Sequence, residues 1–385
     1  MKSLLISAVL ASLFLGCSSS EEEVVTKAAS SESRVMMQNS LYYTTCDGVD
    51  NQCIDEGEIV ELTPSYAYVD VNSDELVIKV RGWVYESDAN FATRFSFLTL
   101  LSAAIGQINS EPSDIEARID PFLSESKENQ LISVQIGTHY YDLSPSSGSG
   151  NFEDEVRLAS AEVDALREEG ILGDTVSYRV LLGRSDKRQI TSDVKIIPND
   201  TTVVISDIDD TIKVSEVYVS KEKLLENTFF KAPRAVESML ELFGQFEASH
   251  GVLNYMYVSG SPKQLLTVIE TFLESSGFKH SAIYLRDFVL SPTASELYSF
   301  LDEDSTYRHK IASISMIMND LPNASFILVG DSGEKDPEVY SALYSTFGEQ
   351  IEGIYIRNVS EETLSNERIK GLFGDYASEV ILVAP

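Results

Sequence analysis

Aspartates follow two apolar runs of the sequence, in positions where they are suited to bind a metal ion together. Residues 203–206 read VVIS and lead into Asp207 and Asp209, and residues 326–329 read FILV and lead into Asp331. Carboxylates this close repel each other unless a cation lies between them. If the two runs are neighbouring strands, the three aspartates converge as hard oxygen ligands of the type that Mg²⁺ prefers. The spacing therefore predicts a divalent metal site.

Groups suited to hold a phosphate lie close to the apolar runs in the same half of the sequence. The apolar run at residues 253–258 ends in Ser259 and Gly260, which offer a hydroxyl and backbone N–H donors at an expected helix start. Lys310 begins the helix before the fourth run and can reach the same cavity. Asp336 adds a carboxylate in the segment after that run.

A sheet must position these residues. After Pro198, short and continuously apolar runs alternate with helical stretches, which is typical of a doubly wound parallel sheet with helices on both faces. Functional residues of such sheets lie at the carboxyl ends of the strands. We expect an α/β domain over residues 199–385. Its strands are expected at residues 203–206, 253–258, 282–285, 326–329, 351–356 and 380–383.

The preceding half follows a different pattern. Strand-like runs are separated by turn signals, and two helical stretches interrupt them. We expect a β-rich, antiparallel sandwich-like domain over residues 59–198 with a helical insertion. Trp83 and His139 are interpreted as packed residues rather than reactive ones. The strands are expected at residues 75–84, 130–137 and 175–182, and the helices at residues 92–106 and 113–123.

The amino terminus has the pattern of an export signal. The apolar run at residues 4–16 is shorter than the roughly 20 residues of a membrane span but suits a signal peptide. It ends at Cys17 in the string LFLGC, which resembles the bacterial lipoprotein signal, where the cysteine is lipidated. We expect residues 1–16 to be removed, Cys17 to anchor the exported chain and residues 17–58 to form a tether. Ser18 favours outer-membrane sorting in such lipoproteins, and an ordinary signal peptide is the alternative.

Two further cysteines lie in the tether. Cys46 and Cys53 form an even pair outside the cytoplasm, which favours a disulfide across a short loop. The loop is interpreted either as a solvated acidic segment or as a calcium site, although its spacing does not match an EF-hand. Two cysteines without a nearby histidine do not complete a zinc site. The acidic residues are Asp47, Asp50, Asp55, Glu56, Glu58 and Glu61.

Composition and charge limit the possible classes of protein. Hydrophobic residues make up 43% and charged residues 23% of the 385 residues, a balance that excludes wholesale disorder. At about 150 residues per domain, the length suggests two domains. The formal net charge is −32. Since nucleic acids bind basic faces, they are excluded as general partners, and contact with an anionic membrane must overcome repulsion.

The second half resembles the haloacid dehalogenase superfamily of phosphohydrolases. Its groups occur in that superfamily's order: Asp-x-Asp-x-Thr, a strand-end serine, a lysine, and Gly-Asp with a further aspartate. The resemblance is narrower to the actin-patch-protein type of phosphatidate phosphatase and covers residues 200–360. It rests on SDIDDTIK at 206–213, YVSGSP at 257–262, LRD at 285–287, HK at 309–310 and GDSGEKDPEVY at 330–340, with RGWV at 81–84 in the first half.

The resemblance implies a role for each residue. Asp207 is the nucleophile that forms an aspartyl-phosphate, and Asp209 protonates the leaving alkoxide and then activates water. Asp336 is expected to orient Lys310 or a metal-bound water, and Thr211 to shape the loop. The expected metal ligands are Asp207, Asp209 through its carbonyl, Asp331 and Asp336. The expected phosphate-binding residues are Ser259, Gly260 and Lys310.

The resemblance also implies the activity, a Mg²⁺-dependent phosphatidate phosphatase that releases diacylglycerol and phosphate at a membrane. The alternatives are a phosphatase of a soluble phosphomonoester and a non-enzymatic surface lipoprotein. The clustered carboxylates argue against the last, because a relic has no physical reason to keep buried like charges together. Arg286 and Arg357, near strand ends, are expected either to hold a second anionic group or to pair with surface acids.

Overall fold

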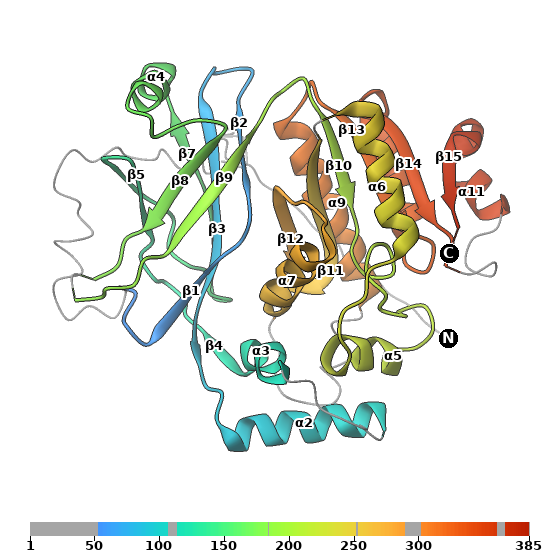
Figure 1. Cartoon of the computed structure of the whole chain (residues 1–385), viewed down its shortest axis with the longest axis horizontal. Helices are drawn as coiled ribbons and strands as arrows, with labels where there is room; N and C mark the ends of the chain where they lie inside the picture. The colour runs from blue at the N-terminus through green and yellow to red at the C-terminus, as the bar shows by residue number, and fades with distance from the viewer. Residues whose placement is uncertain are drawn as a thin grey trace, which may run out of the picture. The chain divides into compact units, whose positions relative to one another are not determined.

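A parallel sheet and a β-rich sheet organise the chain (Figure 1). The computed structural model describes residues 53–106, 114–183, 185–251, 253–288, 302–359 and 366–384. The expected signal peptide, Cys17 and Cys46 lie outside these residues. Cys53 is disulfide-bonded. Because Cys46 lies outside the described residues, the pairing of these two cysteines stays a prediction.

The parallel sheet has six strands in the order β12-β11-β10-β13-β14-β15. Each of the six expected runs forms one of them, which confirms the prediction of a parallel sheet. The first and fourth runs, β10 and β13, are neighbours in register, with Ser206 opposite Val329. Their carboxyl ends therefore meet at one edge of the sheet. The bounds are β10 Thr202–Ser206, β11 Asn254–Pro262, β12 Ala282–Arg286, β13 Ser325–Asp331, β14 Ile351–Arg357 and β15 Val380–Val383.

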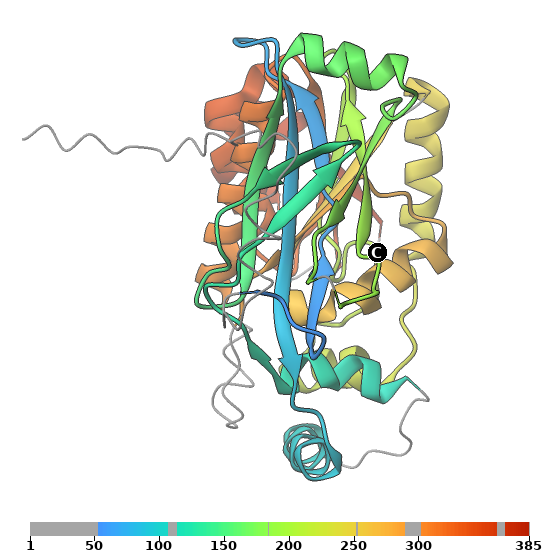
Figure 2. The same ribbon diagram turned by 90° about the vertical axis from the view of Figure 1, so that its left-hand side faces the viewer.

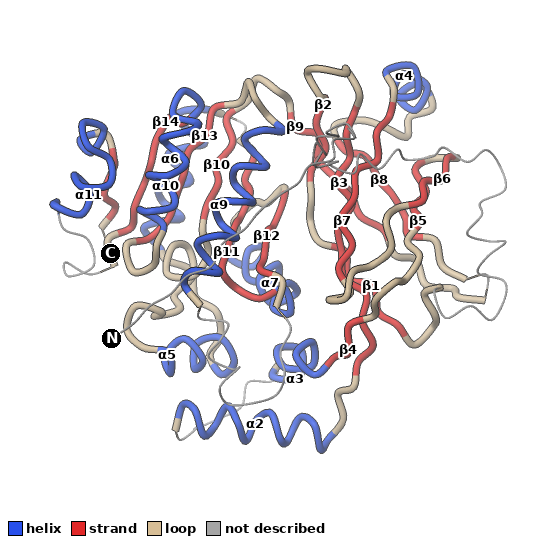
Figure 3. The backbone as a smooth tube through the Cα atoms, turned by 180° about the vertical axis from the view of Figure 1, so that it is seen from behind, coloured by secondary structure: helices blue, strands red, loops and turns tan. Residues whose placement is uncertain are grey.

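Helices cover both faces of this sheet because its strands are apolar on both sides (Figure 3). Val204 lies in a core with α6 (Glu237–His250) and α7 (Leu266–Ser276). Val203 and Ile205 point to the opposite face and lie in a second core. That core contains residues of α9 (Glu303–Asp320), α10 (Asp336–Phe347) and α11 (Asn366–Phe373).

The β-rich part differs from the expected antiparallel sandwich in two respects. Its nine strands are bonded into one sheet, and β2 and β9 pair in parallel (Figure 2). Strands from both ends of the sheet share a single core, so the sheet curls over itself. Trp83 is 3% exposed, as expected. The strands are β1 Glu58–Leu62, β2 Tyr66–Val69, β3 Leu76–Ser87, β4 Ser124–Ser126, β5 Ser133–Ile136, β6 His139–Asp142, β7 Asn151–Leu158, β8 Thr175–Val180 and β9 Thr191–Ile197.

The expected helical insertion follows β3. It consists of α2 (Phe91–Ile105), α3 (Ile115–Ile119) and the 3₁₀ turn Asp120–Leu123. A further helix, α4 (Ser160–Glu168), was not expected. In the part of the chain that the structure describes, no helix is both long and apolar enough to cross a membrane.

The two sheets share a hydrophobic core and a polar cluster. Tyr66 and Tyr68 of β2 lie in the same core as Ile205 of the parallel sheet. Their hydroxyls donate to Asp320, at the end of α9, over 2.6 and 3.0 Å. Lys79 of β3 lies 2.9 Å from the same carboxylate. The described residues accordingly belong to one compact unit.

Two glutamates meet where β1 packs beside α7, and they predict a pH-dependent stability. Burial, with Glu61 and Glu274 nearby, raises the pKa of Glu270 to about 7. In the unfolded chain this pKa is near 4.5, so the folded state binds the proton more tightly and loses stability as pH rises from about 4.5 through 7. Since the side chain is partly exposed, we expect an effect of about 1–2 kcal/mol.

We therefore expect Glu270→Gln to unfold at a higher temperature than the parent protein at pH 8 and at the same temperature near pH 4.5. Thermal unfolding at both pH values measures this difference. Glu241→Gln, an exposed change on α6, is the control. An equal shift at both pH values would contradict the titration of Glu270.

Candidate active site

The loop after β10 is held in one shape by its own side chains. Asp210 adopts a left-handed backbone with φ 55°, a conformation that aspartate tolerates better than most residues. Its carboxylate accepts N–H bonds of 2.9, 2.7 and 2.5 Å from Ser215, Glu216 and Val217. Arg357, the last residue of β14, donates to the Asp210 carbonyl. These bonds fix the backbone of the loop that carries the buried carboxylates of Asp207 and Asp209.

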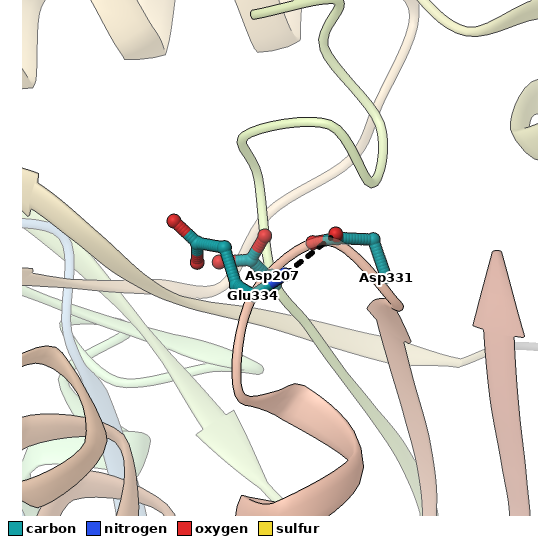
Figure 4. Close-up of side chains that lie close together, drawn as sticks. All are labelled: Asp207, Asp331 and Glu334. Atoms are coloured by element: carbon teal, nitrogen blue, oxygen red, sulfur yellow. Dashed lines mark hydrogen bonds between the residues drawn. The ribbon is translucent and has the colours of Figure 1, made fainter. Parts of the chain in front are cut away.

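Three carboxylates converge at the ends of β10 and β13 (Figure 4). Asp207, Asp331 and Glu334 each place one oxygen so that these oxygens lie within 4.8 Å of one another. Asp331 Oδ1 accepts the N–H groups of Gly333 (2.6 Å) and Glu334 (3.2 Å), which turns the loop back toward Asp207. Burial raises the pKa of all three carboxyls, and the neighbouring carboxylates raise it further. The cluster therefore favours a bound cation.

The donor set fits Mg²⁺. All three groups offer oxygen, the ligand that this ion prefers. Within the described residues, Asp207 Oδ1 receives no hydrogen bond, although the Lys310 ammonium lies 2.9 Å away. Thr211, which is fully buried, donates to Asp207 Oδ2 (3.2 Å) and Asp331 Oδ2 (3.4 Å) and so keeps these two side chains together. Asp207, Asp331 and Glu334 would hold the metal.

Lys310 lies among the acids and carries the compensating positive charge. Its ammonium is 2.9 Å from Asp207, 3.1 Å from Glu334 and 2.5 Å from Asp336. Burial alone would lower the pKa of Lys310, but the three carboxylates hold it well above the ordinary value. Gly330 permits this packing, because a Cβ there would lie 2.6 Å from the Asp336 carboxylate.

The Asp336 side chain is directed to Lys310 and to the N–H of Asp331 (3.1 Å), not to the carboxylate triad. This placement agrees with its expected role of orienting Lys310. Direct binding of the metal, the other expected role, has no counterpart in the position of its carboxylate.

Asp209 faces away from the triad into a separate set of bonds. Its Oδ1 accepts from Ser215 (2.5 Å) and pairs with Lys213 (2.6 Å), while its Oδ2 accepts from Ser261 (2.6 Å) and more distantly from Ser259 (3.4 Å). Burial would raise the pKa of Asp209, but Lys213 and the hydroxyls lower it to about 2. Its carboxylate thus stands apart from the metal ligands, and only its main-chain carbonyl keeps the expected ligand role.

The second motif lies on a strand and not at the expected helix start. β11 continues through Pro262, and its pairing with β12 shifts register after Val258. Because strand side chains alternate, Ser259 and Ser261 point to the same side, toward Asp209. Gly260 between them packs on Thr306 of α9, and a Cβ there would lie 2.6 Å from that side chain.

A cavity of about 260 Å³ opens beside these groups. Its polar wall contains Asp209, Ser261, Lys310 and Glu334. The opposite wall is largely apolar and comes from the segment around α5 (Lys221–Leu225) and from the turn after β11. The apolar residues of the cavity include Val217, Tyr218, Leu224 and Leu265, together with Val339 of α10.

Several residues of this site are missing from the sequence-based expectations. Glu334 completes the triad, and Arg368 of α11 holds its loop by donating to the carbonyls of Ser332 (2.9 Å) and Glu334 (3.1 Å). In the sequence, Glu334 is indicated only by its place in the acidic segment GDSGEKD at residues 330–336. Ser261 would be indicated by the alternation of side chains if the strand were extended past residue 258. Nothing local marks Arg368.

The two arginines near strand ends are engaged within the protein. Arg357 supports the loop after β10, as described above, and Arg286 donates to the main-chain carbonyl of Asp302 over 3.3 Å.

Known proteins resemble this chain in the parallel-sheet half, and one of them matches more of the chain than that half. Residues 202–358 match the family described as the catalytic domain of phosphatidate phosphatase APP1. Phosphatidate phosphatase APP1 of Saccharomyces cerevisiae is 28% identical over 66% of this chain and 46% of its own length. An uncharacterized protein of Schizosaccharomyces pombe is 28% identical over 44% of this chain and 27% of its own length. The chain thus spans less than half of each of these relatives.

The crystal structure of an intact type IV self-sufficient cytochrome P450 monooxygenase matches 82% of this chain and 30% of its own length, with 12% identity and a TM-score of 0.17. A score this low carries no argument about the fold.

Proposed function

We propose that this chain is a phosphatase of phosphatidate, because residues 202–358 match the family described as the catalytic domain of phosphatidate phosphatase APP1. One observation carries the proposal. Asp207, Asp331 and Glu334 converge at two neighbouring strand ends, with Lys310 and a partly apolar cavity beside them. Such a site can bind both the charged phosphate group and an apolar acyl chain of the substrate.

The proposal includes a haloacid-dehalogenase-like fold for the parallel sheet and Mg²⁺ as the cofactor. The order of the motifs and the oxygen-only donor set support both. The bound ion would offset the negative charge of the phosphate and of its ligands, which otherwise repel each other. Lys310 adds a second positive charge at the same place.

In the first half of the reaction, Asp207 attacks phosphorus and an aspartyl-phosphate forms as the bond to the glycerol oxygen breaks. The oxygen leaves as an alkoxide and needs a proton. The substrate binds as a phosphomonoester monoanion, which carries one proton. Asp209 lines the cavity, takes up this proton and delivers it to the leaving oxygen. Ser259, Ser261 and Lys310 bind and orient the phosphate oxygens in the proposal, with the N–H of Gly260 beside them.

In the second half, Asp209 accepts a proton from water as the water attacks the aspartyl-phosphate. The bond between Asp207 and phosphorus breaks, which restores the Asp207 carboxylate and releases phosphate. Lys213 and Ser215 hold the Asp209 carboxylate in place during both halves. Asp209 then passes this proton to the departing phosphate, so that the two steps consume one water and return every residue to its starting state.

The cellular location remains a proposal that depends on residues outside the described part of the chain. The apolar run before Cys17 and the polar stretch after it support an exported protein anchored by a lipid at Cys17, with Ser18 favouring the outer membrane. A lipid anchor would bring the cavity to a membrane substrate. It would also offset the repulsion between the chain, with its charge of −32, and an anionic surface.

The test is phosphate release from phosphatidate in phosphatidylcholine vesicles, compared with soluble phosphomonoesters, with Mg²⁺ present. We expect the vesicle substrate to be preferred in kcat/KM by at least about tenfold. Running the parent and the Cys17→Ser variant side by side separates the anchor from the chemistry. A preference for a soluble monoester would favour the second hypothesis, and no release from any substrate would favour the non-enzymatic one.

A further inference from the structure

The outer face of α2 is exposed and uncharged, and it carries two phenylalanines. Phe91 is 85% and Phe95 63% exposed, and they are the two most exposed large apolar side chains among the described residues. Their rings stack with a centroid distance of 6.2 Å. Ser96, Thr99 and Ala103 continue the exposed face. Arg94 is the only charged residue of this helix, and it pairs with Asp120 and Glu116 of the adjacent turn and helix.

The fold holds α2 in this position. Asn90 caps its first turn by accepting from the N–H of Thr93 (3.1 Å), and Thr93 accepts in return from the N–H of Asn90 (2.9 Å). On the inner side, Phe97 and Leu101 are buried in the core that covers the parallel sheet. The exposed phenylalanines are therefore a stable feature of the surface, and such patches mark interaction sites.

α2 lies close to the wall of the catalytic cavity. The ring of Phe97 is 6.1 Å from that of Phe229, whose neighbour Thr228 lines the cavity. α2 also packs against α5, whose Leu224 lines the cavity (Figure 1). Just before α5, Val219 is 54% exposed, which makes it the third most exposed large apolar side chain described.

We propose that α2 docks the protein on a lipid bilayer, with Phe91 and Phe95 inserted between the headgroups beside the catalytic cavity. An uncharged helix face with protruding aromatic rings suits the boundary between headgroups and acyl chains. Docking there places the cavity next to the membrane that carries its substrate. This role rests on the proposed function, because a soluble substrate would give the cavity no reason to approach a membrane.

Charge favours a bilayer over a second copy of this chain as the occupant. Two copies, each with a formal charge of −32, repel each other on approach, and the one charged side chain of α2, Arg94, already pairs with Asp120 and Glu116 of the same chain. A phosphatidylcholine surface carries no net charge. The helix is about 22 Å long and lies on the surface through one face, which gives it the size of an interfacial anchor.

The experiment places a tryptophan at the tip of the helix in the full chain. Trp83 is the only tryptophan and is buried, so Phe91→Trp adds the one exposed indole. With phosphatidylcholine vesicles we expect its emission to shift to shorter wavelength and to lose most of its intensity when the lipid is brominated. Val71→Trp is the control, because Val71 is 46% exposed and precedes β3, roughly 40 Å along that strand from α2.

Two results would overturn the proposal. One is an unchanged emission of Phe91→Trp, or a change that Val71→Trp shares. The other is a shift that depends on protein concentration without lipid, which would assign α2 to a second copy. In a separate variant with Phe91→Ser and Phe95→Ser, both at exposed sites, we expect partitioning into the vesicles to weaken by at least about tenfold.

The optical readout does not depend on turnover. Insertion of the indole without hydrolysis of phosphatidate contradicts the proposed function and leaves the docking role intact for another membrane ligand. Hydrolysis without insertion contradicts the docking role alone.

Discussion

Replacement of Asp207 by asparagine is expected to abolish phosphate release, with a loss of about 10⁴-fold or more in kcat. The asparagine amide keeps the size of the side chain but is not a nucleophile that can form the acyl phosphate. It also removes one oxygen ligand from the triad and leaves Lys310 with two carboxylates in place of three. Steady-state phosphate release with saturating Mg²⁺ measures the effect, with circular dichroism to confirm that the variant is folded.

Asp210→Asn is the matched control for this prediction. Asp210 is as buried as Asp207, but its carboxylate binds three backbone N–H groups of its own loop. Asparagine tolerates the left-handed backbone at this position and keeps one acceptor oxygen. We expect a lower unfolding temperature and substantial residual turnover. Appreciable activity in Asp207→Asn would exclude Asp207 as the nucleophile.

Removal of divalent metal is expected to stop the reaction completely. Three carboxylates, two of them buried, and one lysine leave excess negative charge at the place where a phosphate must bind. A chelator should therefore reduce phosphate release to background, and added Mg²⁺ should restore it. Glu334→Gln should raise the Mg²⁺ concentration needed for half-maximal activity by about 10–100-fold, with a smaller change in the maximal rate.

The exposed change Glu241→Gln on α6 serves as the control, since it removes the same charge from a different part of the fold. An unchanged Mg²⁺ requirement in Glu334→Gln would remove Glu334 from the ligand set. Full activity after chelation would count against a metal-dependent reaction as a whole.

Much of this arrangement was predictable because its determinants are local. A continuously apolar run of four to six residues between helical stretches is typical of a buried parallel strand. The aspartates after residues 203–206 and 326–329 occupy fixed places at the ends of such strands. Asp207 and Asp331 therefore come together if the two strands are neighbours. In the structure, β10 and β13 are neighbours.

The remainder depends on long-range contacts that no local pattern carries. Glu334 reaches the triad only because Asp331 bonds its N–H and Arg368, 34 residues away, holds its carbonyl. The length of β11 depends on a register shift against β12. Likewise, the β-rich half closes into one sheet through the parallel pairing of β2 with β9, two strands that are far apart in the sequence.

The hydrophobic core that Tyr66 and Tyr68 share with Ile205 makes the two sheets thermodynamically dependent on each other. Separating them would expose apolar surface on both and leave Lys79 and Asp320 without their ion pair. The two sheets then unfold together with a single free energy of unfolding, although only the parallel sheet carries the carboxylates of the site. A destabilising mutation anywhere in the β-rich sheet consequently lowers the fraction of molecules with an assembled site. Activity is then lost because fewer molecules are folded, while the rate of the chemical step in each folded molecule is unchanged.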